Sequence, residues 1–180
     1  MKRLKINSMS KTDKYQHGLI AFYLKEFKAL KNKKISFLEL GVFKGDSLKV
    51  WGKFFKNGRI YGLDGWIPPV KFPPNVKTFQ GAQENIPFID EIGKQAGPFD
   101  IILDDCSHEY APTAISHNTL YPYLKPGGLY IIEDWTAGFI KTKKFYGLQK
   151  LILELVERRD FQEMRIIKLP QGGSTILIKK

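Results

Sequence analysis

Residues 35–47 read ISFLELGVFKGDS, an apolar run that ends in an acid and passes into a turn containing two glycines. The apolar, β-prone residues 35–40 predict a buried strand, and residues 45–56 predict the helix that follows. The glycines allow the backbone to approach a ligand closely, and the start of the helix offers free N–H groups to an anion. The turn lacks both the dinucleotide-binding G-x-G-x-x-G spacing and the Gly-Lys-Ser/Thr ending of a P-loop. Nicotinamide and triphosphate ligands are therefore disfavoured.

The same alternation of strand and helix continues toward the C-terminus. Four further short apolar runs predict strands, at residues 59–63, 76–79, 99–103 and 129–132. Candidate helices lie at about 84–96, 109–124 and 144–158. Because parallel strands need crossover connections, this order predicts a parallel sheet with helices on both faces. The expected fold class is therefore α/β, with a Rossmann-like doubly wound sheet.

Two segments depart from this alternation. Prolines at positions 68, 69, 73 and 74 disfavour a helix between the second and third strands, so we expect a shaped loop there. Residues 164–169 and 174–178 are joined by Pro170–Gly173 and predict a hairpin. The sheet is thus expected to be mostly parallel, with an antiparallel C-terminal edge strand.

The composition narrows the class of protein. The chain has 180 residues, of which 43% are apolar, enough for the core of one globular domain and too many for a disordered or collagen-like chain. No apolar stretch approaches the roughly 18 residues that cross a bilayer, and no apolar leader core follows the basic residues 1–14, so we expect neither a membrane span nor export. Cys106 is the only cysteine, which excludes an internal disulfide and a cysteine zinc cluster. A reducing, cytoplasmic location is expected.

The net charge of +11 is concentrated near the N-terminus. Residues 1–34 carry ten lysines and arginines against two acids. Apolar residues recur at helical spacing between positions 11 and 30 and predict an amphipathic helix, which Thr12 or Ser10 would cap. We expect residues 1–34 to form a helical segment packed on the core of a domain that spans residues 35–180. Scattered lysines more often form a solvated face than a nucleic-acid site, so RNA binding is the weaker alternative.

Acidic residues stand at the ends of four predicted strands: Glu39, Asp64, Asp104, Asp105, Glu133 and Asp134. The carboxyl ends of parallel strands form the ligand crevice of a doubly wound sheet, so these side chains are expected to converge. Like charges about 4 Å apart repel by roughly 4 kcal/mol at an effective dielectric constant of about 20, and they therefore need cationic or hydrogen-bond-donating neighbours. In a chain of net positive charge this placement predicts a ligand site. The alternative is that the acids only mark exposed strand ends and cap helices.

Asp64 closes the second predicted strand, 23 residues after Gly41. An acid in this place can accept hydrogen bonds from both hydroxyls of a ribose. A nucleoside-bearing cofactor without phosphates therefore fits both this acid and the glycine turn.

Several short motifs together resemble the class I S-adenosylmethionine-dependent methyltransferases. Residues 39–45 resemble the E-x-G-x-x-x-G turn of that class, and Asp64 resembles its ribose-binding acid. Gly81-Ala82-Gln83 is similar to the loop that borders adenine, and residues 125–128 to the turn before the fifth strand. The resemblance covers nearly the whole chain. It implies that residues 35–180 form an S-adenosylmethionine-binding methyltransferase domain.

A narrower resemblance rests on three blocks of sequence. Residues 12–18, with Thr-Asp-Lys and His-Gly, residues 104–108, DDCSH, and residues 131–134, IIED, resemble the metal-dependent O-methyltransferases of the macrocin type. That family acts on sugar hydroxyls. Cys106 stands where glycine is usual in the family.

The resemblance implies specific roles. Magnesium would be held by Asp105, Glu133 and Asp134, and His108 would be the general base. S-adenosylmethionine would be bound by His17, Glu39, Gly41, Gly45, Ser47, Asp64, Gln83 and Asp104; ordinary helix packing is the alternative for His17. Magnesium prefers carboxylate and water oxygens, and a neutral histidine can take the proton that a hydroxyl loses during methyl transfer.

The expected activity is therefore O-methylation of a hydroxyl on a sugar or polyol-like small molecule. Two alternatives stay open: an RNA methyltransferase that uses the basic first segment, and a regulatory module that binds the cofactor without catalysis. His108 could instead cap a helix, the acids could bind cofactor alone, and the chain could form a homo-oligomer.

Overall fold

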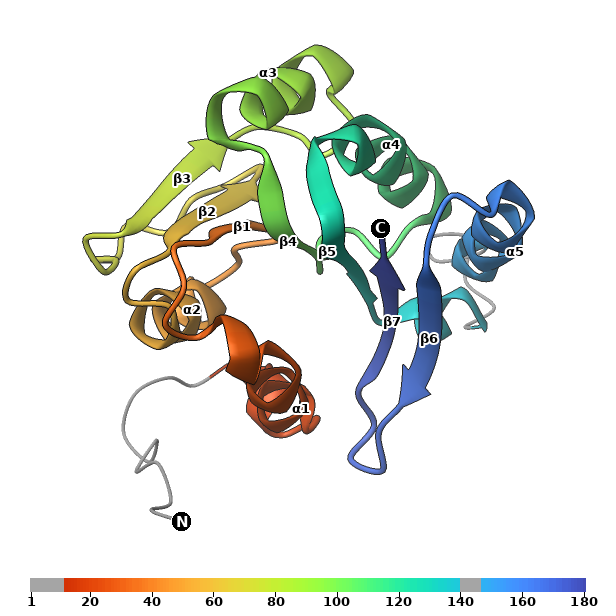
Figure 1. The fold of residues 1–180 in the computed structure, drawn as a ribbon, viewed down its shortest axis with the longest axis horizontal. Coiled ribbons are helices and arrows are strands. Elements are labelled where there is room, and N and C mark those ends of the chain that lie inside the picture. Colours follow the sequence, from red (N-terminus) through yellow and green to blue (C-terminus); the bar gives the residue numbers. More distant parts are fainter. Residues whose placement is uncertain (1–11, 140–146) are drawn as a thin grey trace.

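The computed structural model describes residues 12–139 and 147–180 and contains a seven-stranded sheet with helices on both faces (Figure 1). Its strand order is β3-β2-β1-β4-β5-β7-β6. The strands are β1 Ser36–Leu40, β2 Arg59–Asp64, β3 Val76–Gln80, β4 Phe99–Asp104, β5 Leu124–Glu133, β6 Glu163–Lys168 and β7 Ser174–Lys179. Strands β1 to β5 are parallel, and β7 is antiparallel to both β5 and β6. The predicted Rossmann-like, mostly parallel sheet is confirmed.

The strand order reverses at β1, which lies between β2 and β4. Connections that leave neighbouring strands in opposite directions open a crevice at their carboxyl ends. In the register of the sheet, Leu40 of β1 lies opposite Leu63 of β2 and Asp104 of β4. The three strands therefore end at the same level, and the segments that follow them share one edge.

The helices divide between the two faces of the sheet. They are α1 Leu19–Glu26, α2 Asp46–Phe54, α3 Ile86–Ala96, α4 Tyr110–Leu120 and α5 Leu148–Arg158. Helices α1 and α2 pack on one face, and α3, α4 and α5 on the other (Figure 1). The predicted helices at 45–56, 84–96, 109–124 and 144–158 correspond to α2 through α5, although residues 144–146 lie outside the described ranges.

An aromatic cluster fixes α1 and α2 on the sheet. Tyr23, Phe27, Phe37, Trp51 and Phe55 are fully buried. Phe27 stacks on Tyr23 with centroids 5.4 Å apart, and its ring lies 5.8 Å from that of Trp51. Truncating a buried aromatic of this kind to alanine typically costs about 3–5 kcal/mol. Helix α1 and the turn that begins at Phe27 are thus part of the core.

The expectation of one helix over residues 11–30 is wrong in its extent. The structure has a 3-10 turn at Asp13–Tyr15, then α1, then a second 3-10 turn at Phe27–Leu30. Gly18 separates the first two with a φ of +78°, a left-handed conformation that glycine adopts at little cost. Thr12 precedes the first turn without a capping hydrogen bond from its side chain, and Ser10 lies outside the described residues. The break allows residues 12–14 to turn toward the carboxyl edge of the sheet.

The two predicted departures from the alternation are present. No helix forms between β2 and β3, a region that is fully described, and Asn75 ties this loop to α2 by donating to the carbonyl groups of Gly52 and Phe55. The hairpin of β6 and β7 forms as predicted, with β7 inserted next to β5 so that β6 is the outermost strand. Within the described ranges, no helix combines the length and apolar character needed to cross a bilayer.

Candidate active site

A cleft of about 410 Å³ lies at the carboxyl edge of the sheet. Three parts of the chain form its walls: residues 12–14, the glycine turn after β1, and the strand ends at the last residue of β2 and just after β4 and β5. The lining residues are Thr12, Asp13, Lys14, Gly41, Val42, Phe43, Lys44, Asp46, Ser47, Asp64, Asp105, Cys106, His108 and Asp134. The predicted convergence of acids from separate strands therefore occurs.

The predicted site residues fall into two groups. Those that line the cleft are Gly41, Ser47, Asp64, Asp105, His108 and Asp134. Those that lie outside its lining are His17, Glu39, Gly45, Gln83, Asp104 and Glu133. Four members of the second group are buried directly behind the cleft: Glu39, Gln83, Asp104 and Glu133. His17 is exposed, and its carbonyl group accepts a hydrogen bond from the N–H of Gly173.

The glycine turn is held tightly against the loop after β4. Gly41 has a φ of +93°, and a Cβ atom there would lie 2.0 Å from the carbonyl oxygen of Asp105. Only glycine fits this position. Asp64 organises the rest of the turn, because its Oδ2 accepts hydrogen bonds from the N–H groups of Val42 and Phe43 at 2.8 and 2.9 Å. The acid at the end of β2 thus shapes the wall of the cleft that it lines.

Glu39 lies under the same turn. Its side chain is fully buried and accepts hydrogen bonds from the Ser47 hydroxyl at 2.8 Å and the indole N–H of Trp51 at 3.4 Å. Burial, only partly opposed by the charge of Lys14, raises the pKa of Glu39 to about 7. This acid therefore links β1 to the first turn of α2.

A second buried network supports the loop after β4. The Gln83 amide nitrogen donates to both carboxylate oxygens of Asp104 at 3.1 Å, and its oxygen accepts from the N–H of Ser107 at 3.2 Å. Ser116 of α4 also donates to Asp104, at 2.6 Å. Burial raises the pKa of Asp104 to about 6. Gln83 and Asp104 thus fix the start of the loop that carries His108.

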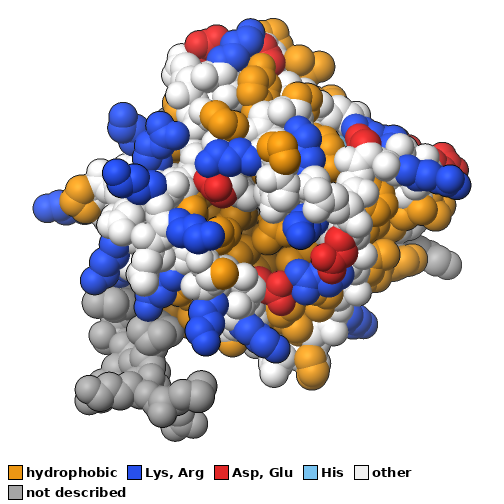
Figure 2. Space-filling model, in the orientation of Figure 1, with side chains coloured by type: hydrophobic (Ala, Val, Ile, Leu, Met, Phe, Trp, Pro, Cys, Tyr) orange, Lys and Arg blue, Asp and Glu red, His pale blue; other side chains and the backbone are white. Residues whose placement is uncertain are grey.

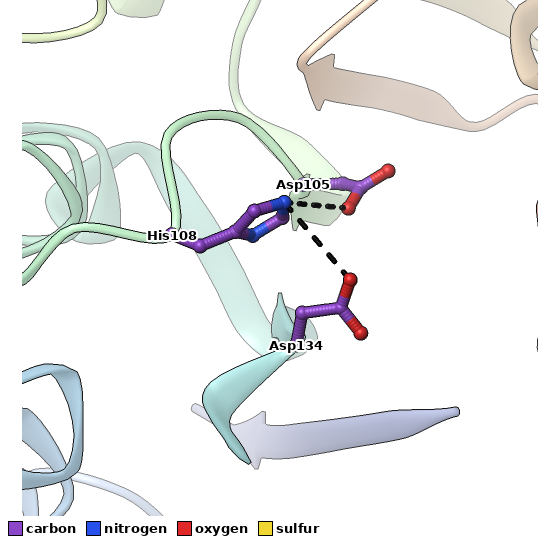
Figure 3. Close-up of side chains that lie close together, drawn as sticks. All are labelled: Asp105, His108 and Asp134. Carbon is purple, nitrogen blue, oxygen red and sulfur yellow. Dashed lines mark ion pairs between the residues drawn. The ribbon is translucent and has the colours of Figure 1, made fainter. Parts of the chain in front are cut away.

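His108 faces two carboxylates across the cleft (Figure 3). Its Nε2 lies 3.8 Å from Asp105 Oδ1, after β4, and 4.0 Å from Asp134 Oδ2, after β5. Both His108 and Asp134 adopt a positive φ, of 56° and 52°. Such backbone strain in non-glycine residues is found where a functional site needs an unusual side-chain direction.

The acids of this edge suit a hard divalent cation. One ligand atom each from Asp105, His108 and Asp134 lies within 4.8 Å of the others. Burial, and then the charge of Asp105, raises the pKa values of both Glu133 and Asp134. The Oε1 atom of Glu133 is buried and has no hydrogen-bond partner among the described residues. A cation relieves this kind of crowding between carboxylates, and magnesium takes such oxygen ligands.

Lys14 stands in the sequence block of residues 12–18 but was given no role there, and the structure places it among three of the acids. Its ammonium group contacts Asp105 Oδ2 directly, and it lies 2.8 Å from Glu133 Oε2 and 3.9 Å from Glu39 Oε1. Only 3% of Lys14 is exposed. Burial alone would lower its pKa, but the charges of Asp105, Glu133 and Glu39 outweigh burial and raise it. In the sequence Lys14 stands in a basic segment, where a lysine normally indicates a solvated face.

Cys106 lines the cleft between Asp105 and Ser107. Burial raises the pKa of its thiol well above the usual range, and the neighbouring acids raise it further. A protonated thiol is a poor nucleophile, which agrees with the absence of Cys106 from the expected chemistry.

These features define a class. The profile of the family described as "Methyltransferase domain" matches residues 38–135, more than half of the chain, so the chain belongs to this family. Its sheet and switch-point cleft are those of the class I S-adenosylmethionine-dependent methyltransferases.

The relatives within this class are more particular. Mycinamicin VI 2''-O-methyltransferase from Micromonospora griseorubida is 39% identical over 131 residues, which are 68% of this chain and 33% of that protein. Demethylmacrocin O-methyltransferase from Streptomyces fradiae is 36% identical over 129 residues, 67% of this chain and 33% of that protein. The chain thus spans about a third of the length of these curated relatives.

Solved structures give the same picture. The MycE methyltransferase of the mycinamycin biosynthetic pathway, in complex with Mg, SAH and mycinamycin VI, superposes with a TM-score of 0.77 at 28% identity. The match covers 89% of this chain and 48% of that one. A putative ribosomal RNA methyltransferase from Plasmodium falciparum has a TM-score of 0.68 at 22% identity, over 96% of this chain and 97% of that one, and shows the shared fold alone.

Proposed function

We propose that this chain is an S-adenosylmethionine-dependent O-methyltransferase that acts on a hydroxyl group of a sugar or a similar polyol. The observation that carries the proposal is the grouping of Asp105, His108 and Asp134 in a cleft beside the glycine turn. Support also comes from relatives named for the O-methylation of glycosylated compounds, such as 8-demethyl-8-(2-methoxy-alpha-L-rhamnosyl)-tetracenomycin-C 3'-O-methyltransferase from Streptomyces olivaceus, 35% identical over 129 residues, 67% of this chain and 33% of that protein.

In this proposal the adenosyl part of the cofactor lies against the glycine turn, Gly41 to Ser47, with Asp64 accepting from the ribose. Glu39, Gly45, Gln83 and Asp104 contribute to the same cofactor site, chiefly by holding the walls of the cleft in place. His17 would meet the cofactor only if the exposed segment around it closes over the cleft.

The chemistry at the other side of the cleft would fall to His108. The acceptor hydroxyl gives its proton to Nε2 as its oxygen takes the methyl group, while the bonding electron pair stays on the sulfur of the donor. Asp105, Glu133 and Asp134 would hold magnesium, which lowers the pKa of a bound hydroxyl and neutralises developing charge. Asp105 and Asp134 also face Nε2 of the imidazole, at 3.8 and 4.0 Å.

The acceptor is proposed as a small molecule rather than RNA. Lys and Arg side chains lie scattered over much of the visible face in Figure 2, with apolar atoms exposed between them. RNA-binding proteins instead gather their cations into a patch or stripe that follows the phosphates. The expectations of a cytoplasmic location and of a homo-oligomer stay predictions.

The test is methyl transfer from labelled S-adenosylmethionine, with magnesium present, to a panel of glycosides with neighbouring hydroxyls, simple phenols and RNA. The proposal expects label on the glycosides. Label on RNA alone would support the RNA methyltransferase instead, and S-adenosylmethionine binding without transfer to any acceptor would support the regulatory module.

A further inference from the structure

The acids at the carboxyl edge form an inner and an outer layer around Asp105. In the inner layer, Asp105 Oδ2 contacts the ammonium group of Lys14, which also lies 2.8 Å from Glu133. In the outer layer, Asp105 Oδ1 lies 3.8 Å from His108, whose ring also faces Asp134. Asp105 is therefore shared between a fixed cation of the protein and the group that suits a metal ion.

The inner layer is sealed from water. The side chains of Lys14, Glu39 and Glu133 are 4%, 0% and 1% exposed, whereas those of Asp105 and Asp134 are 23% and 43% exposed. Buried charges are screened little, so the ammonium group acts strongly on carboxylates around it and on any cation nearby. A bound metal ion would meet Asp105 and Asp134 from the cleft and Glu133 through Oε1, while Lys14 holds Oε2 of Glu133.

We propose that Lys14 is a built-in counter-ion of this acid cluster and that it sets the affinity of the outer carboxylates for a divalent cation. The inference rests on the proposed function only in assigning the metal to this cleft. Lys14 is a positioning residue, because its ammonium group lies among three carboxylates and acts on the outer site through Asp105. Its charge lowers the attraction of the site for a second cation and makes the cluster stable without one.

Two consequences follow from this arrangement. Removing the ammonium charge leaves Asp105, Glu133 and Glu39 to repel one another, so the protein loses stability in the absence of metal. The same removal leaves the cluster with a larger negative charge, so a divalent cation binds more tightly and restores the lost stability. The divalent cation thus takes over the charge-neutralising role of the Lys14 ammonium group.

The experiment compares wild type with Lys14→Met, which keeps most of the side-chain volume but not the charge. Magnesium affinity is measured by titration calorimetry, and the midpoint of thermal unfolding is measured with and without magnesium. We expect Lys14→Met to bind magnesium at least about tenfold more tightly than wild type. We also expect it to melt at a lower temperature without magnesium and to regain most of that loss with it.

Two further variants separate charge from packing. Lys125→Met removes a lysine that pairs with Asp100 at 2.8 Å at the opposite end of the sheet, and it should leave magnesium affinity unchanged. Lys14→Arg retains the charge and should keep magnesium affinity near that of wild type. If Lys14→Met folds only when magnesium is present, that result also supports the proposal.

Unchanged or weaker magnesium binding by Lys14→Met would overturn the proposal, as would a loss of folding that magnesium does not restore. A gain in affinity of equal size in Lys14→Arg would also contradict it, because the charge would then not be the cause. None of these measurements uses methyl transfer, so a protein that methylates sugars but fails them would refute the role of Lys14 and leave the proposed function standing.

Discussion

The two ends of the same strands carry ion pairs of equal length in very different surroundings. At the amino end, Lys125 lies 2.8 Å from Asp100, and their side chains are 37% and 22% exposed. At the carboxyl end, Lys14 lies 2.8 Å from Glu133, and their side chains are 4% and 1% exposed. Exposed pairs of the first kind contribute at most about 1 kcal/mol, and water readily replaces either partner.

Desolvation of carboxylates and repulsion between them are concentrated at the buried carboxyl end of the sheet. The carboxyl edge holds more acids than the single ammonium group of Lys14 can neutralise. The free energy lost when these carboxylates leave water therefore exceeds what their attraction to Lys14 recovers. Raised pKa values that arise from burial and like-charged neighbours, at residues that line a cleft or lie buried behind it, are typical of functional sites. At the amino end, where no ligand site is proposed, the same strands carry a partly exposed ion pair of one acid with one base.

The largest expected effect is the loss of turnover in His108→Ala. General bases typically contribute about 10²–10⁴-fold to rate, so methyl transfer should fall by that range while affinity for S-adenosylhomocysteine stays near wild type. Lys125→Met, at the other end of the sheet, is the matched control and should keep wild-type turnover. Transfer at the parental rate in His108→Ala would remove the histidine from the mechanism.

Two glycines allow the backbone packing at the carboxyl and amino ends of the sheet to be compared. Gly41 and Gly127 both have a positive φ. A Cβ at Gly41 would lie 2.0 Å from the carbonyl oxygen of Asp105, whereas one at Gly127 would meet no atom of residues 12–139 or 147–180 within 4 Å. Gly127→Ala should therefore cost only the left-handed strain, about 1–2 kcal/mol. Gly41→Ala adds overpacking of about 1–3 kcal/mol.

Urea unfolding of the two glycine variants measures this difference directly. Gly41→Ala should also lose affinity for S-adenosylhomocysteine, because the turn and the loop after β4 have to separate. Equal losses of stability in the two variants would contradict the close packing at the carboxyl end.

The pH dependence of the free energy of unfolding should differ between Glu39→Gln and wild type. Burial, the main cause, raises the pKa of Glu39 from 4.5 to about 7. The folded protein therefore holds a proton that the unfolded chain releases, so this group lowers stability as the pH rises from about 4.5 to about 7. The effect amounts to at most about 3 kcal/mol. Glu39→Gln should flatten the curve of unfolding free energy against pH in this window, and Lys125→Met should not; a wild-type slope in Glu39→Gln would contradict the assignment.

The smallest expected effect is the stability change in Lys125→Met itself. Because its ion pair is partly exposed, the free energy of unfolding should fall by no more than about 1 kcal/mol, and less at high salt. Chemical denaturation at low and high salt checks this value. A loss of several kcal/mol, independent of salt, would mean that the amino end is as dependent on its charges as the carboxyl end.

Most of the sheet could be predicted because its strands are short, apolar and bounded by turns or acids. Residues 99–103 were expected as a strand, and β4 spans Phe99–Asp104. The sequence predicts a single helix over residues 11–30 because a lone glycine within an apolar repeat looks tolerable. The structure instead breaks this segment at Gly18. Only the tertiary structure gives Gly18 its left-handed conformation.

The candidate site was predictable as a meeting of strand ends but not in its inner arrangement. The register of parallel strands brings the loops of Asp64 and Asp105 together whatever the side chains do. The burial of Lys14 depends on the helix break at Gly18, and the spacing of apolar residues in the sequence does not reveal that break. The local pairing of Ser47 with Glu39 also needs the actual turn geometry.

Titration calorimetry with S-adenosylhomocysteine tests the central claim most directly, using Asp64→Ala at the carboxyl end and Asp100→Ala at the amino end. We predict a single site in wild type, a loss of affinity of at least about tenfold in Asp64→Ala, and wild-type affinity in Asp100→Ala. The absence of binding to wild type, or equal losses in the two variants, would contradict the assignment of the ligand site to the carboxyl edge of the sheet.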